Sequence, residues 1–314
     1  MTDRPFDLSK LSRYSLHSRN SKVTTDDFAK PVKKGMTVAE WLDGLPNILA
    51  APNLRDLAKA IAAARKAGRP VHIGMGAHVL KVGLGPLLID LMEKQIITGL
   101  SFNGAVLVHD YEIAAAGKTS EDVDAVLGKG QFGMAEETGR DLCRFIHRGA
   151  DENLGLAGGV GRGILDGDFP HKNVSVLAQG VANNITLTCH PALGTDITHL
   201  WPDLDWGKLG AAAGRDFLTF TAMVEQMRGG VYLNIGSAVV MPEVFLKAVT
   251  AVRNIGADHT GITTANFDFL RHYRPATNVV RRPTAGVGRG FDFAGHHEIM
   301  IPLLFAAVFE EISA

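Results

Sequence analysis

Residues 71–110 constrain the fold more than any other stretch, because they read as two strands joined by a turn and a helix. Val71–Met75 is short, apolar and partly β-branched, as buried strands are. Several glycines then free the backbone to turn, and Pro86 suits a first helical turn. Ile96–Phe102 predicts the second strand, which ends abruptly at Asn103. This βαβ unit places polar residues at the carboxyl ends of its strands, where open α/β sheets bind ligands.

The rest of the chain continues the alternation of strands and helices. Further strands are expected over 185–188, 231–235 and 259–264, and helices over 53–66, 134–147, 209–227, 242–252 and 297–312. Such alternation predicts a mostly parallel sheet with helices on both faces. The expected fold class is therefore α/β and Rossmann-like.

Two other segments have a distinct character. Residues 1–34 are polar and interrupted by proline, so we expect an N-terminal arm followed by a single domain over 35–314. Thr37 and Glu40 form a capping-box pattern that opens a short helix. Residues 149–171 are rich in glycine but match neither phosphate-loop pattern, and we interpret them as a flexible lid or surface loop.

Composition narrows the class of protein. The net charge of −1 over 314 residues argues against a general nucleic-acid or anionic-membrane surface. Two cysteines fit a reducing compartment, and the start of the chain has no apolar signal core. We expect a soluble cytoplasmic protein. No histidine pattern typical of a zinc site occurs, and no metal is expected.

Polar residues recur at the expected ends of successive strands. Each alone is as easily a turn or capping residue, but together they predict a ligand cleft. The set comprises His78, Asn103, His109, Asp110, His190, Asp196, Thr264 and Asp268. Among them we expect His109, Asp110 and Asp268 to be catalytic. The pKa of an unperturbed histidine makes His109 the natural proton carrier, with the two carboxylates orienting it or holding a cationic nitrogen.

The same motifs resemble those of the deoxyhypusine synthases, in order from Val71 to Phe305. The family's Asn-x-x-Ser-Ser-Gly and Thr-Ala-Gly-Gly turns are similar to His78–Gly83 and Asn103–Val106. Further matched segments are His190–Asp196, Leu233–Val240, Asn254–Asp258, Thr263–Asp268 and Ile301–Leu304.

The resemblance implies an NAD site, an amine or polyamine-like substrate and a homotetramer. The implied cofactor residues are Asn103, Gly104, Ala105, Gly236, Ser237, Thr264 and Ala265, with Lys81 as a phosphate contact or a surface lysine. The implied substrate residues are His190, Asp196, Glu243 and His296. At His296 the family has an aspartate, so the charge preference is inverted there.

The family's nucleophilic lysine has no counterpart here. It precedes the closing helix by about a dozen residues, but residues 281–290 contain only arginines as basic residues. Arginine stays protonated and cannot form the imine that passes an aminobutyl group on. The arginines at 271, 274, 281 and 282 suit an anionic substrate or a cofactor phosphate.

Three functions therefore stay open at the level of sequence. The first is a diverged NAD-dependent enzyme that acts on an amine or amino-acid-like substrate without the lysine-imine step. The second is deoxyhypusine or homospermidine synthesis proper. The third is a non-catalytic dinucleotide- or metabolite-binding protein.

Overall fold

The computed structural model describes residues 5–313, and the chain divides into two compact units between Pro52 and Asn53. The first unit contains α1 (Val38–Asp43) and short 3-10 helices at Leu8–Lys10, Leu16–Ser18 and Thr25–Asp27. Thr37 caps α1 as predicted. The Glu40 amide donates to Thr37 Oγ1 over 3.2 Å, and the Thr37 amide donates to Glu40 Oε2 over 2.8 Å.

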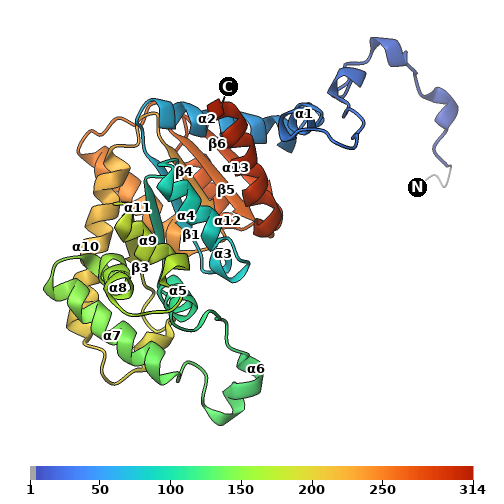
Figure 1. Cartoon of the computed structure of the whole chain (residues 1–314). Helices are drawn as coiled ribbons and strands as arrows, with labels where there is room; N and C mark the ends of the chain where they lie inside the picture. Colours follow the sequence, from blue (N-terminus) through green and yellow to red (C-terminus); the bar gives the residue numbers. More distant parts are fainter. Residues whose placement is uncertain (1–4, 314) are drawn as a thin grey trace. The chain divides into compact units, whose positions relative to one another are not determined.

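The second unit is built on a six-stranded, all-parallel sheet in the order β3-β2-β1-β4-β5-β6 (Figure 1). The strands are β1 (Val71–Met75), β2 (Gly99–Asn103), β3 (Thr186–His190), β4 (Val231–Ile235), β5 (Thr263–Asp268) and β6 (Arg289–Ala294). This is the strand order of a Rossmann fold. The predicted fold class is confirmed.

Helices connect the strands. They are α2 (Ala50–Lys66), α3 (His78–Lys81), α4 (Gly85–Glu93), α5 (Gly104–Ala116), α6 (Val123–Val126), α7 (Glu136–Asp151), α8 (Gly155–Asp166), α9 (Val176–Ala182), α10 (Trp206–Glu225), α11 (Val240–Asn254), α12 (Tyr273–Pro275) and α13 (His297–Ser313). Short 3-10 segments lie at Leu127–Lys129, Lys172–Val174 and Ile197–Leu200, and a π-helical segment spans Ala276–Arg281.

Helices cover both faces of the sheet. On one face, Phe220 of α10 and Phe245 of α11 belong to a fully buried apolar cluster with Tyr232 of β4. The rings of Tyr232 and Phe245 stack with centroids 3.9 Å apart. Figure 1 shows α4 and α13 in front of the strands, and Lys94 beside α4 lies 5.2 Å over the Phe309 ring of α13. The continuous apolar runs of the strands follow from burial on both sides.

The glycine-rich segment at 149–171 is not a loop, so that prediction is wrong. Its centre forms α8, which packs closely against α7. A Cβ atom on Gly159 would lie 2.6 Å from the Cα atom of Gly149, so the glycines allow the two helix backbones to touch. Asp216 of α10 stabilises the start of α8 by accepting the Ala157 amide over 3.0 Å.

The predicted strand at 259–264 is displaced, because β5 runs from Thr263 to Asp268. Asn266 lies inside β5, where its side-chain amide is hydrogen-bonded to the neighbouring strands. The polar edge strand β6 was not predicted, since half of its residues are exposed and its pattern is not apolar. Thr264 and Ala265 therefore lie inside a strand and not at its carboxyl end.

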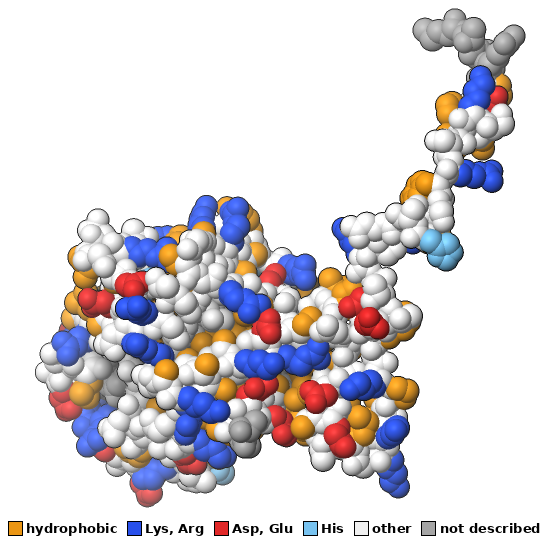
Figure 2. All heavy atoms as spheres, turned by 90° about the horizontal axis from the view of Figure 1, so that it is seen from above, with side chains coloured by type: hydrophobic (Ala, Val, Ile, Leu, Met, Phe, Trp, Pro, Cys, Tyr) orange, Lys and Arg blue, Asp and Glu red, His pale blue; other side chains and the backbone are white. Residues whose placement is uncertain are grey.

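The turn expected at Asn103-Gly104-Ala105 is also shorter than predicted. Helix α5 begins at Gly104, directly after β2, so His109 and Asp110 lie on a helix. The other predicted elements are present, with ends shifted by a few residues. Among the described residues, no helix is both long and apolar enough to cross a membrane. Figure 2 shows basic and acidic side chains interspersed over the face that it displays.

Candidate functional site at the carboxyl edge of the sheet

Strands β1 and β4 are neighbours at the centre of the sheet, and the chain leaves them toward opposite sides. This is the switch point where Rossmann folds form a crevice. The turns after both strands are held tightly. The Gly76 amide donates to Ile235 O over 3.0 Å, and the Gly236 amide donates to Phe267 O over 2.9 Å. Because the Gly236 amide is used in this way, it is not free to donate a hydrogen bond to a ligand.

A group of rings, here called the edge cluster, lies beside these turns: His78 after β1, Phe269 after β5, and His296 and His297 after β6. The ring centroids of His78 and His297 are 5.5 Å apart, and those of His78 and Phe269 are 6.0 Å apart. Phe269 and His296 stack at 6.1 Å. The sequence predicted His78 and His296 at this edge but missed His297 and Phe269.

His297 is the buried member of the edge cluster, with 1% of its surface exposed. Its Nε2 donates to Phe267 O over 3.2 Å, so the neutral ring leaves Nδ1 as an acceptor. That buried Nδ1 has no hydrogen-bond partner among residues 5–313. Burial lowers the pKa of His297, which keeps the ring neutral.

A ladder of polar side chains supports the turn after β4. Asn234, Asn266 and Asp292 are in register on β4, β5 and β6. Asn234 Nδ2 donates to Asn266 Oδ1 over 2.8 Å and to Ser237 O over 2.9 Å, and Asn266 Nδ2 donates to Asp292 Oδ1 over 2.8 Å. Ser237 Oγ in turn accepts the Met241 amide over 3.1 Å at the start of α11. The ladder fixes Ser237 at the switch point.

Asn103 ends β2 on the other side of the switch point. It is the N-cap residue of α5 but makes no side-chain capping bond. Its Oδ1 is buried and lacks a hydrogen-bond partner in the described part of the chain. A buried acceptor without a donor is costly in a folded protein, and one at a ligand-binding edge is a candidate ligand contact.

Asp196 lies against the first turn of the same helix. A Cβ atom on Gly104 would be only 1.9 Å from Asp196 Oδ2, so the glycine makes room for the carboxylate. Burial raises the pKa of Asp196 to about 6. His199 Nε2 is 4.0 Å from Asp196 Oδ2, while its Nδ1 accepts the Asp196 amide over 3.2 Å. The structure thus gathers Asn103, Gly104 and Asp196 at one place, as the sequence suggested.

The three predicted catalytic residues have separate surroundings. Asp110 is fully buried and accepts the amides of Val176 and Leu177 over 2.8 and 3.0 Å, which caps the N-terminus of α9. Asp268 accepts the Leu270 amide over 3.3 Å and lies 4.0 Å from His272 Nε2. Both carboxylates therefore accept backbone amides, as turn and capping residues do. Burial raises the pKa of Asp110 to about 6.

Of the three residues, His109 is the one that begins a series of side-chain hydrogen bonds, through Thr119 to Glu112. Thr119 Oγ1 donates to Glu112 Oε2 over 2.5 Å, so it accepts from His109 Nδ1, which is 2.7 Å away. Burial is the main cause that lowers the pKa of His109, and the charge of Lys81 adds to it. Neither Thr119 nor Glu112 was singled out from the sequence, since the spacing 109, 112 and 119 matches no known motif.

Several predicted binding residues are engaged elsewhere. Thr264 Oγ1 donates to Val279 O over 2.7 Å inside the sheet, and Ala265 is fully buried. Glu243 lies 2.5 Å from Lys247 Nζ and 3.3 Å from Arg274 Nε, and Asn278 Nδ2 donates to it over 2.8 Å. Its charge is already balanced. Lys81 is exposed at the end of α3.

His190 belongs to a buried hydrogen-bonded chain that the sequence did not reveal. The chain runs from His72 Nε2 through Ser101 Oγ and Thr188 Oγ1 to His190 Nε2, over 2.7, 2.5 and 3.1 Å. Burial lowers the pKa of His72 to about 3 and that of His190 to about 4. Both rings are therefore neutral at physiological pH, and the chain crosses β1, β2 and β3 behind the edge.

Among the described residues, no group of three or more histidine, cysteine or carboxylate side chains is arranged to hold a metal ion. The polar groups of the edge suit an organic ligand better than a cation site. They are mainly imidazole rings, an amide oxygen and backbone groups.

No family model matches the chain, and no curated protein matches it either. Among solved structures, the complex of AgrE with ornithine and NAD⁺ superposes with a TM-score of 0.53 at 18% identity, covering 83% of this chain and 33% of AgrE. The apo arginine dihydrolase ArgZ, from the ornithine–ammonia cycle in cyanobacteria, gives 0.52 at 17% identity, covering 85% and 34%.

A provisionally assigned deoxyhypusine synthase from Entamoeba histolytica also superposes, with a TM-score of 0.52 at 13% identity. It is matched along its length, with 90% of this chain and 96% of that chain covered. The chain spans only about a third of AgrE and ArgZ. These similarities define the class of fold, which is α/β, Rossmann-like and deoxyhypusine synthase-like.

Proposed function

We propose that this protein is a diverged, NAD-dependent enzyme that acts on an amine or amino-acid-like substrate at the carboxyl edge of the sheet. The proposal rests above all on one observation. The switch-point edge presents three buried polar atoms, Asn103 Oδ1, Asn234 Oδ1 and His297 Nδ1, that have no partner among the described residues. Buried acceptors of this kind are normally satisfied, and a ligand that donates hydrogen bonds would satisfy them.

The hydrogen-bonding groups at this edge are of the types that bind a dinucleotide. Asn103 Oδ1 and His297 Nδ1 would accept from hydroxyl or amide groups, and the turn at Gly236-Ser237 sits where Rossmann folds receive a dinucleotide. A bound NAD would supply a hydride acceptor for a carbon next to a substrate nitrogen. The AgrE structure with ornithine and NAD⁺ adds support at the level of fold.

The chain's own residues would handle protons and orientation. His109, with its proton held on Nδ1 by Thr119, has Nε2 available as a base. Asp196, whose pKa is raised to about 6 by burial, is a second group able to exchange a proton near neutral pH. These two side chains replace the trio expected from sequence, because Asp110 is committed to capping α9.

The lysine-imine step is not part of the proposal. The segment between Asp268 and His296 contains arginines and no lysine. Lys247 is exposed on α11 and paired with Glu243, and Lys81 is exposed at the end of α3. Aminobutyl transfer would need a lysine at the reacting carbon.

Calorimetric titration with NAD tests the cofactor assignment. We expect binding to the wild-type protein, and about tenfold weaker binding for Asn103→Ala, because a hydrogen bond to a ligand contributes on the order of 1.5 kcal/mol. Asn254→Ala, at the exposed end of α11, is the matched control and should bind like wild type. Equal affinities for Asn103→Ala and wild type would remove Asn103 from the site. If titration of the wild-type protein with NAD gives no heat of binding, the NAD assignment is wrong. A binding site for another metabolite would then be the function left.

A further inference from the structure

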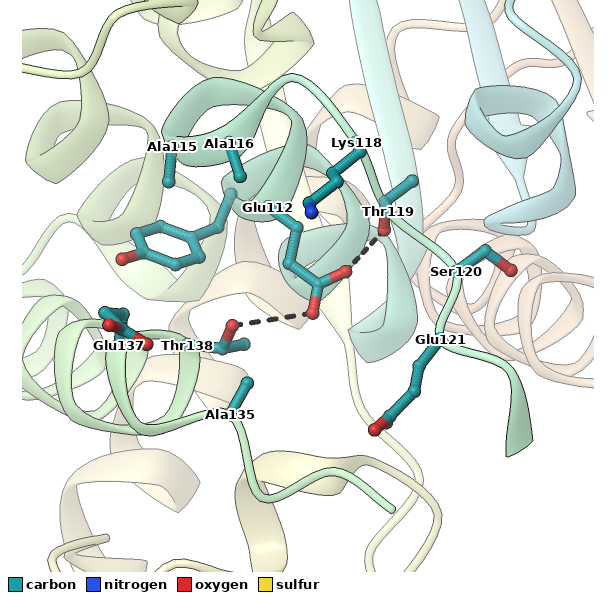
Figure 3. Close-up of a pocket in the computed structure, with 11 residues that line it drawn as sticks. Glu112, Ala115, Ala116, Lys118, Thr119, Ser120, Glu121, Ala135, Glu137 and Thr138 are labelled. Carbon is teal, nitrogen blue, oxygen red and sulfur yellow. Dashed lines mark hydrogen bonds between the residues drawn. The ribbon is translucent and has the colours of Figure 1, made fainter. Parts of the chain in front are cut away.

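A pocket of about 570 Å³ lies between the C-terminal half of α5, the segment after it and the start of α7 (Figure 3). Its volume is within the range of small-molecule sites. Part of its lining is apolar, from the ring of Tyr111 and the methyl groups of Ala115, Ala116 and Ala135. Glu112 lies eight residues after Gly104 on α5, which places the pocket about 12 Å along the helix from the carboxyl edge.

The charge of the pocket is negative. Three carboxylates line it, from Glu112, Glu121 and Glu137, against the single ammonium of Lys118. In Figure 3 the Glu112 carboxylate sits between two hydroxyl groups. Thr119 Oγ1 donates to it over 2.5 Å and Thr138 Oγ1 over 3.4 Å. Glu121 Oε2 accepts the Gly133 amide over 3.0 Å.

Neutral donors orient the Glu112 and Glu121 carboxylates without cancelling their charge. Glu243 differs in this respect, since it is paired with Lys247 and Arg274. The Glu112 side chain is also sheltered, with 21% of its surface exposed. A fixed and partly desolvated carboxylate above an apolar floor favours a ligand with one cationic end and one aliphatic end.

We propose that this pocket binds a primary alkylamine, with its ammonium at Glu112 and its aliphatic part against Tyr111 and the alanines. The proposal does not depend on dinucleotide binding at the carboxyl edge. Hydrogen bonds run from Glu112 through Thr119 to His109, so an amine at Glu112 changes the electrostatic field at the His109 ring. The physical link is that the bound ammonium would take the place of the Thr119 hydroxyl as a hydrogen-bond donor to Glu112.

The test is an NMR-monitored titration of the full chain with n-hexylamine in the absence of NAD. Hexanol and hexanoate have the same aliphatic part with a neutral or negative end, and they serve as ligand controls. We expect hexylamine to shift backbone resonances of α5 and α7 and the ring signals of His109. Glu112→Gln should weaken hexylamine binding at least about tenfold, whereas Glu93→Gln on α4 should not alter it.

A second variant separates binding from folding. Ala116→Leu keeps a strong helix former on α5 and fills the pocket, so it should abolish hexylamine binding while the thermal midpoint stays near that of wild type. Equal binding of hexanol and hexylamine, or unchanged affinity in Glu112→Gln, would overturn the proposal. Neither outcome bears on NAD binding, which the Asn103 variant tests separately.

Discussion

The ring of His297 occupies the space beside Gly236, where a Cβ atom would lie 2.5 Å from His297 Cε1. Gly236 also has a φ of +64°, a conformation that favours glycine. The close approach joins the turn after β4 to the start of α13. It explains why the switch point is built from a glycine turn on one side and a buried histidine on the other.

Substitution of Gly236 by alanine should lower the free energy of unfolding by roughly 2–4 kcal/mol, because steric overlap adds to the cost of a positive φ. Gly256→Ala is the matched control. Gly256 has a φ of +90° but nothing within 4 Å of the added atom, so only the backbone cost applies. Urea unfolding of both variants measures the difference. Equal losses would contradict the packing role of His297.

Alanine at Gly159 should destabilise the protein even though alanine favours helices. The added atom would lie 2.6 Å from Gly149 Cα and would push α7 and α8 apart. Gly210→Ala in α10 meets nothing within 4 Å and should stabilise the protein by about 1 kcal/mol. A lower thermal midpoint for Gly159→Ala and a higher one for Gly210→Ala would support close packing of the two helices. A higher midpoint for both variants would refute it.

Asp216 should make stability fall as the pH rises from 4 to 7. Burial raises its pKa from 3.8 to about 7, so the folded state binds the proton more tightly than the unfolded state does. The resulting stabilisation is complete below pH 3.8 and is lost as the pH rises through 7. Asp216→Asn removes this dependence. We expect its stability relative to wild type to increase between pH 4 and 7, as measured by urea unfolding at each pH.

His72 should act in the opposite sense at acid pH. Burial lowers its pKa from 6.5 to about 3, so its contribution is present above pH 6.5 and lost as the pH falls toward 3. His72→Gln retains a hydrogen-bonding group toward Ser101 but cannot be protonated. Its stability should therefore depend less on pH between 6.5 and 4 than that of wild type. An identical pH profile would show that His72 is not the acid-sensitive group.

Treatment with spermidine, NAD and borohydride should leave every lysine unmodified. An imine between a lysine and an aminobutyl group would be reduced to a stable secondary amine, and peptide mass mapping would locate it. The absence of a lysine from 269–296 is the reason for this expectation. A butylated Lys81 or Lys247 would restore aminobutyl transfer as the function.

The sequence alone determined the central βαβ unit and the class of fold. The apolar run at Val71–Met75 and the abrupt polar end at Asn103 depend on local pattern. The first strand lies where it was predicted, whereas β2 begins at Gly99 and not at Ile96. Local pattern also placed Asn103, Gly104 and Asp196 at the carboxyl edge. Such features need no knowledge of the rest of the chain, because burial on both faces and turn chemistry are written in consecutive residues.

Only the tertiary structure decided which polar groups are available to a ligand. Asp110 reads as a site residue until α9 supplies the amides of Val176 and Leu177, from a segment 65 or more residues away. Glycines 155–163 read as a loop until α7 approaches closely enough to need them. His109 gains its partner Thr119 through a turn that no motif marks. Hydrogen bonds and close contacts between distant segments depend on geometry in three dimensions, and residue order does not contain it.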